Sequence, residues 1–95
     1  MFEFLSSTNR KLRRRAVHAV AEHIGYPNPS SSRVGYYIKG NMGALYSAFA
    51  PYQINDRVTA VNVNFSLRRG GYPEGEGVVV VSFDQQLNVI GCEAQ

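Results

Sequence analysis

Three residues near the start of the chain, His18, Glu22 and His23, have side chains that could bind a metal ion. His18 and Glu22 lie four residues apart, which places both side chains on one face of a helix. A metal site needs at least one further ligand, and the sequence holds no cluster of Cys and His residues to supply it. His23 falls among apolar positions, where we expect a packed, hydrogen-bonded histidine. We therefore expect neither a metal nor another cofactor.

The single cysteine, Cys92, is the other candidate for chemistry. A cysteine beside a histidine can act as a nucleophile pair, but a lone cysteine in a strand is ordinarily a small apolar residue. Glu74 and Asp84 lie in segments rich in turn residues, where carboxylates are common. The glycines of residues 70–77 match neither a P-loop nor a dinucleotide-binding pattern. We expect no enzyme activity.

Five cations crowd into the first half of a predicted helix: Arg10, Lys11, Arg13, Arg14 and Arg15. Cations in a first helical turn oppose the helix dipole, at a cost of about 0.3–1 kcal/mol, and no acidic residue lies three or four positions away to offset them. Arg13 alone falls within the apolar arc, and we expect its head to reach over the rim. A local rule broken without compensation often marks a functional site. Two interpretations stay open, a solvated face that aids solubility and a contact with an anionic partner.

The anionic partner could belong to either of two classes. The first is a protein with an acidic surface, which would make the chain a small non-enzymatic binding module, an inhibitor or adaptor of the kind that phages and mobile elements encode. The second is a nucleic acid whose phosphates meet the arginines. Sequence readout needs aromatic or amide groups beside the basic cluster, and the helix offers only Asn9 and His18, so we favour the protein. The predicted protein-binding residues are Arg10, Lys11, Arg14, Arg15, Val78 and Val80, and the nucleic-acid alternative uses Arg10, Lys11, Arg14, Arg15, Arg68 and Arg69.

A helix from Ser7 to Ile24 must carry the basic cluster. Its apolar residues recur at three- and four-residue spacing along one arc, with Val17 at the edge of that arc. Gly25 is a natural C-terminal cap, and the prolines at 27 and 29 prevent the helix from continuing. Residues 1–5 could form an extra turn or a short strand. The predicted arc consists of Leu12, Ala16, Ala19, Val20 and Ile24.

The clearest strand is the segment 57–69, in which apolar and polar residues alternate. Period-2 alternation is typical of a strand with one buried face. We predict that Val61, Val63, Phe65 and Leu67 pack against the apolar arc of the helix. The intervening residues Asn62, Asn64 and Ser66 then point away from the helix.

The remaining segments complete an antiparallel sheet. Residues 34–39 alternate as a strand, 40–43 form a turn, and 44–50 fit either a strand or a helix, with the strand favoured by the flanking Gly and Pro. Residues 69–77 are predicted as a loop, 78–83 as a strand, and 84–86 as a turn into a last strand. In that strand, Leu87, Val89 and Gly91 alternate with Asn88, Ile90 and Cys92. The predicted fold class is α+β, with one N-terminal amphipathic helix on one face of a four- to five-stranded antiparallel sheet.

A single helix leaves the second face of that sheet to be covered by something else. Val78 and Val80 must point opposite to Val79 and Val81, so the terminal hairpin is apolar on both faces. Residues 1–5, or the loops around Tyr26 and Tyr52, could cover the second face. The alternative is a protein interface, either with a second copy of the chain or with a target.

Composition sets the outer limits of these interpretations. Ninety-five residues make a single domain, 1–95, and the net charge of +3 favours acidic partners without approaching a histone-like balance. One cysteine fits a reducing compartment. No apolar stretch has the roughly 20 residues of a membrane span, and no secretory signal is apparent. We expect a soluble, cytoplasmic protein without a membrane partner.

Overall fold

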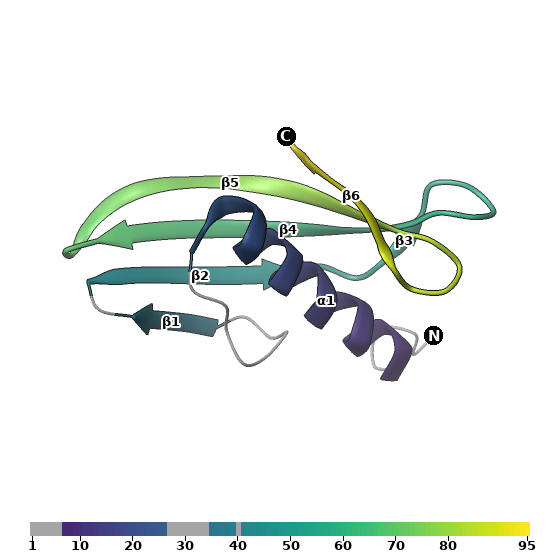
Figure 1. Ribbon diagram of the computed structural model, residues 1–95, viewed down its shortest axis with the longest axis horizontal. Coiled ribbons are helices and arrows are strands. Elements are labelled where there is room, and N and C mark those ends of the chain that lie inside the picture. Colours follow the sequence, from purple (N-terminus) through teal and green to yellow (C-terminus); the bar gives the residue numbers. More distant parts are fainter. Residues whose placement is uncertain (1–6, 27–34, 40) are drawn as a thin grey trace.

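The computed structural model describes residues 7–26, 35–39 and 41–95. One helix packs on one face of an antiparallel sheet with the strand order β1-β2-β4-β5-β6, and the short β3 pairs with β4 beside the end of β2 (Figure 1). The predicted α+β class is therefore confirmed. The elements are α1 (Ser7–Ile24), β1 (Gly35–Lys39), β2 (Met42–Ala48), β3 (Tyr52–Gln53), β4 (Thr59–Arg69), β5 (Tyr72–Phe83) and β6 (Val89–Ala94).

Helix α1 has the bounds that its sequence predicts. At its C-terminus, Gly25 adopts a positive φ of 74°, and its N–H donates to the Glu22 carbonyl at 3.3 Å. The Tyr26 N–H donates to the Ala21 carbonyl at 3.0 Å. This pair of bonds is a Schellman motif, in which a left-handed glycine satisfies the last carbonyls of the helix. The question of a turn or strand at residues 1–5 lies outside the described residues.

The core lies between α1 and the strands β2, β4 and β5. The predicted packing of β4 against the helix is confirmed, although Phe65 and Ile24 are only partly buried. Val17 is fully buried and His23 is exposed, so the prediction of a packed His23 is wrong. The helix is rotated relative to the predicted arc, so that Val17 and Ala21 are fully buried while Ala19 is only partly buried. The fully buried side chains of greatest volume are Tyr46, Phe83, Val17, Val20, Val61, Val63, Val79 and Val81.

Strand β2 resolves the ambiguity of residues 44–50 in favour of a strand. It pairs with β1 in a register that sets Lys39 opposite Met42. Met42 and Gly43, predicted as part of the turn, therefore belong to the strand. Val34, the first residue of the predicted strand 34–39, lies outside the described residues.

The predicted loop at residues 69–77 is wrong, because nearly all of it is strand. Gly70 and Gly71 have φ values of 59° and 85° and alone form the turn, with Arg69 opposite Tyr72. Two consecutive positive φ angles are typical of a type I′ turn, whose twist matches that of the flanking strands. Gly77 lies within the strand, and a glycine suits this position because a Cβ there would lie 3.0 Å from Cζ of Phe65.

The last strand is shifted relative to its predicted alternation. Leu87 has a positive φ of 67° and belongs to the turn. A register shift pairs Ser82 with Gly91 but Phe83 with Val89, so Ile90 is an extra, bulged residue. The bulge places Val89 and Cys92 on the same side of the strand, although simple alternation predicts opposite sides.

The β4–β5 turn gives a stability prediction with an internal control. Gly71→Ala is expected to lower the free energy of unfolding by about 1–2 kcal/mol, because an L-residue there must adopt the left-handed conformation. Gly75→Ala, in the same hairpin, has ordinary backbone angles and no atom within 4 Å of the new Cβ. It should change the unfolding free energy by less than about 0.5 kcal/mol. Urea denaturation measures both, and equal losses would show that the turn does not require two left-handed residues.

Candidate functional site

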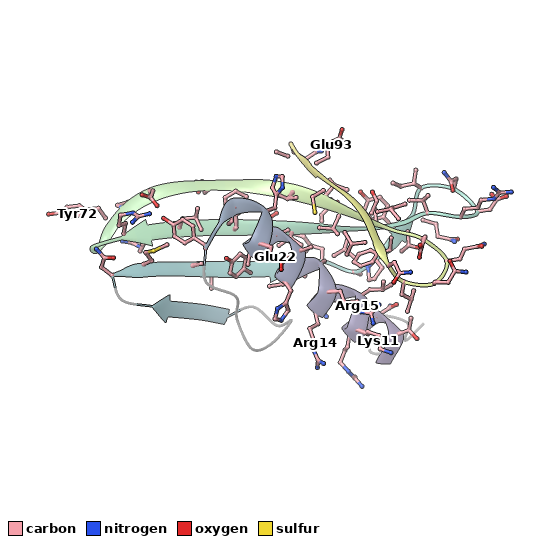
Figure 2. All side chains as sticks on the ribbon, viewed as in Figure 1. Lys11, Arg14, Arg15, Glu22, Tyr72 and Glu93 are labelled. Carbon is pink, nitrogen blue, oxygen red and sulfur yellow. The ribbon has the colours of Figure 1, made fainter. Side chains whose placement is uncertain are left out.

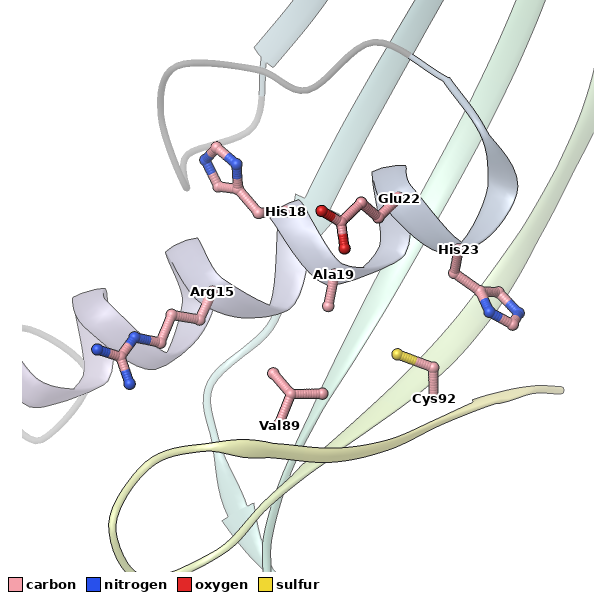
Figure 3. A pocket seen from close by; sticks show the side chains of 7 residues that line it. All are labelled: Arg15, His18, Ala19, Glu22, His23, Val89 and Cys92. Atoms are coloured by element: carbon pink, nitrogen blue, oxygen red, sulfur yellow. The ribbon is translucent and has the colours of Figure 1, made fainter.

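A hollow of about 510 Å³ lies between α1 and β6 and brings together the residues that could do chemistry. Figure 3 shows Cys92 on the strand facing the helix, with Glu22 and His23 on the helix above it. The hollow is lined by Arg15, His18, Ala19, Glu22, His23, Val89 and Cys92.

The geometry of this hollow gives no catalytic or metal-binding arrangement. In the part of the chain that the structure describes, no three His, Cys, Asp or Glu side chains are placed to hold a metal ion. Cys92 is a free thiol without a hydrogen bond to His23 among these residues. Burial raises the pKa of the Cys92 thiol, whereas a nucleophilic cysteine needs its pKa lowered.

The two carboxylates considered at turns serve the fold. Asp84 Oδ1 accepts the N–H groups of Gln86 and Asn88, each at 2.9 Å, and so closes the β5–β6 turn. Glu74 pairs with Arg69, with Oε1 and Nε 2.8 Å apart.

The predicted basic cluster forms a stripe along the first half of α1. Figure 2 shows Lys11, Arg14 and Arg15 along the first half of α1, and all three are exposed. Arg10 is also exposed. We refer to Arg10, Lys11, Arg14 and Arg15 as the basic helix stripe.

Arg13 and Arg15 of the predicted cluster each donate a hydrogen bond to a backbone carbonyl of the sheet or its turns. Arg13 lies on the buried side of the helix, and its Nε donates to the Ala48 carbonyl at 3.0 Å. Arg15 donates from an Nη to the Leu87 carbonyl at 2.6 Å, which ties the helix to the β5–β6 turn. The expected reach of Arg13 past the apolar arc therefore ends on a backbone acceptor. Arg15 has a structural role that the sequence did not indicate.

Two cations of the basic helix stripe have no negatively charged partner among the described residues. The first turn of α1 has no acidic residue, and Lys11 and Arg14 form no ion pair with any other described residue. Their neighbours on the buried side of the helix, Leu12 and Ala16, are locked in the core. The two cations therefore sit on a rigid support that holds them one turn apart.

Arg68 and Arg69 lie at the other end of the molecule, at the tip of the β4–β5 hairpin. Figure 2 shows Tyr72, beside this tip, at the opposite end from Lys11. Arg68 donates to the Gly71 carbonyl at 3.0 Å, and Arg69 pairs with Glu74 and lies 6.0 Å from the ring centre of Tyr26. The six residues of the nucleic-acid alternative thus form two separate groups.

Val78 and Val80 lie on the face of the sheet opposite to α1, together with the polar residues of β4. The register places Val80 beside Asn62 and Val78 beside Asn64, and directly opposed residues point to the same face. Both valines are half-buried. We call this surface the open sheet face, and it consists of Leu45, Ser47, Asn62, Asn64, Ser66, Glu76, Val78, Val80, Ser82 and Glu93.

Three segments are candidates to cover the open sheet face, and of those that the structure describes only one reaches it. Residues 1–5 lie outside the described residues. Tyr26 packs on the core side, whereas the Tyr52 hydroxyl reaches the open face and donates to Asn62 Oδ1 at 2.9 Å. The predicted protein-binding set is therefore divided, with its arginines on the helix and its valines on the opposite face.

Comparison of the chain with models of protein families, with curated proteins and with solved structures finds no match. Within the described residues, no helix has the length and apolar character needed to cross a membrane.

Proposed function

We propose that the chain is a non-enzymatic protein-binding module, an inhibitor or adaptor, whose basic helix stripe docks on an acidic protein surface. One observation carries the proposal: Lys11 and Arg14 are exposed cations without an ion pair among the described residues, in the first half of a helix whose first turn has no acidic residue. An external anion would supply the missing partner.

Three features support a protein partner over a nucleic acid. The stripe offers only a few cations, and Arg68 and Arg69 are too far away to extend it along a phosphate backbone. The amides Asn62 and Asn64 lie on the opposite face of the sheet, so they could not read bases beside the stripe. That face also carries two carboxylates, which would repel phosphates.

The proposal includes the cellular setting that the sequence suggests. A free thiol at Cys92 is suited to a reducing cytoplasm. A small domain that acts by surface contact alone suits a stand-alone inhibitor such as phages and mobile elements encode.

The test reverses charge at the two uncompensated positions. Lys11→Glu/Arg14→Glu is compared with Arg57→Glu/Arg68→Glu, which makes the same change in net charge at exposed sites outside the stripe. Each protein is used to capture partners from the native host, with and without nuclease. The first pair should weaken capture of a nuclease-resistant protein about tenfold or more, while the control pair and both thermal melting curves stay near wild type.

Binding to a 20-base-pair DNA duplex at several salt concentrations provides the second arm. Phosphate contacts by the four cations of the stripe would give a slope of log K against log salt near −3 to −4. Such a slope, together with capture that is lost on nuclease treatment, would replace the protein partner with a nucleic acid. Equal weakening by the two variant pairs would remove the stripe as a specific site.

A further inference from the structure

A second hollow lies on the open sheet face, away from the basic helix stripe. It has a volume of about 310 Å³, at the lower end of the roughly 300–1,000 Å³ range of ligand pockets. Two rows of paired residues border it, Leu45–Ser66–Glu76 and Ser47–Asn64–Val78, each running across β2, β4 and β5. Phe65 and Gly77, a directly opposed pair between these rows whose side-chain positions point to the helix side of the sheet, also line the hollow.

The hollow has a single charge, the carboxylate of Glu76. Glu76 is exposed and forms no ion pair with the other described residues. Arg68, at the tip of the β4–β5 hairpin, donates a guanidinium N–H to the Gly71 carbonyl. Glu93, the other carboxylate of this face, is placed beside Val80 and lies outside the hollow. An anionic ligand is therefore disfavoured here and a cation favoured.

The other lining groups complement a long cationic side chain. Ser47, Asn64 and Ser66 add hydroxyl and amide oxygens that can accept N–H bonds around the carboxylate. Leu45 and Val78 form apolar walls beside them, which suit the methylene stem of such a side chain. A guanidinium, with five donors in a planar fork, uses this set of acceptors more fully than an ammonium group.

From these features we infer that the open sheet face is a second protein-binding site, which accepts an arginine side chain of a partner segment between Leu45 and Val78 and pairs it with Glu76. This site is independent of the basic helix stripe, because the two lie on opposite faces of the sheet. A chain with both sites could hold an acidic surface and a basic segment at the same time, as an adaptor does.

The test uses the capped peptides acetyl-Leu-Arg-Leu-amide and acetyl-Leu-Gln-Leu-amide, titrated into the full chain and followed by amide chemical shifts. The arginine peptide should shift the signals of Ser47, Asn64, Ser66 and Gly77. Glu76→Gln should weaken this binding about fivefold or more, as expected for loss of a charge-assisted hydrogen bond. Glu93→Gln removes the same charge from the same face outside the hollow and should bind like wild type.

Several outcomes would overturn the inference. Equal affinity of the glutamine and arginine peptides would show that the hollow does not select a cation, and equal weakening by the two carboxylate variants would show that Glu76 is not the paired group. Chemical-shift changes concentrated at the hollow between α1 and β6 would show that the peptide binds there and not on the open sheet face. Sedimentation that shows a dimer through the open sheet face, abolished by Val80→Lys, would make a second copy its occupant. Because neither peptide engages the basic helix stripe, failure here leaves the proposed function standing.

Discussion

Replacing Phe83 by alanine is expected to lower the free energy of unfolding by about 3–5 kcal/mol. Phe83 has no exposed surface and lies at the end of β5, where it pairs with Thr59 and Val89. Its loss would open a cavity in the core, since neighbouring side chains relax only partly into such a space. For a domain whose total stability is on the order of 5–15 kcal/mol, this is a large fraction.

Phe49 provides a matched control for this prediction, because its side chain is 49% exposed. Phe49→Ala should cost less than about 1 kcal/mol. Denaturant unfolding measures both changes in the free energy of unfolding. If the variants share the wild-type m-value, each change follows from the shift in the midpoint denaturant concentration. A loss below about 1 kcal/mol for Phe83→Ala, or equal losses for the two variants, would mean that the core is centred elsewhere.

The second large effect is a loss of stability at high pH that originates in Tyr46. Its side chain has no exposed surface, and burial raises the pKa of its phenol from 10.0 to about 12. Between these two values the unfolded chain releases the proton while the folded chain keeps it, so unfolding becomes more favourable as pH rises. The folded state should lose about 2–3 kcal/mol from this residue between pH 10 and 12.

Tyr46→Phe isolates this contribution. The variant should be less stable than wild type at pH 8, since Tyr46 also takes part in an interaction within the fold, yet its stability should fall less between pH 9 and 11.5. Cys92, whose thiol pKa is also raised by burial, acts in the same direction in both proteins and cancels from the comparison. Parallel pH profiles from urea melts would contradict the assignment to Tyr46.

The elements with strong local signals could be predicted from the sequence. Helix α1 has a period of apolar residues and a Gly25 cap, and both bounds follow from them. The alternation in β4 correctly assigns Val61 and Val63 to the helix side. These signals depend on residues close together in the chain, which is why they can be read without a structure.

The errors arise where a distant part of the chain decides the local conformation. Residues 72–77 look like a loop because of their glycines, but pairing with β4 extends them and Phe65 packs over Gly77. The bulge at Ile90 depends on the register with β5, so alternation alone misplaces Cys92. The rotation of α1 that buries Val17 and exposes His23 is set by the sheet beneath it.

The candidate surfaces could be predicted only in part. The basic cluster is visible in the sequence, but the bond from Arg15 to Leu87 joins residues far apart in the chain. Only the sheet topology shows that Val78 and the arginines lie on opposite faces. The hollow beside Glu76 was missed because residues 74–77 were predicted as a loop, and its signal would have been the alternation of Glu76 with Gly75 and Gly77.

Photocrosslinking from the basic helix stripe tests the central proposal most directly. A benzophenone amino acid is introduced at position 14 and, as a control, at position 57, in full-length protein produced in the native host. We expect position 14 to crosslink to a protein through an acidic surface, with a product that survives nuclease, and position 57 to give no such product. Crosslinks to nucleic acid, or the same products from both positions, would contradict a protein-binding role for the basic helix stripe.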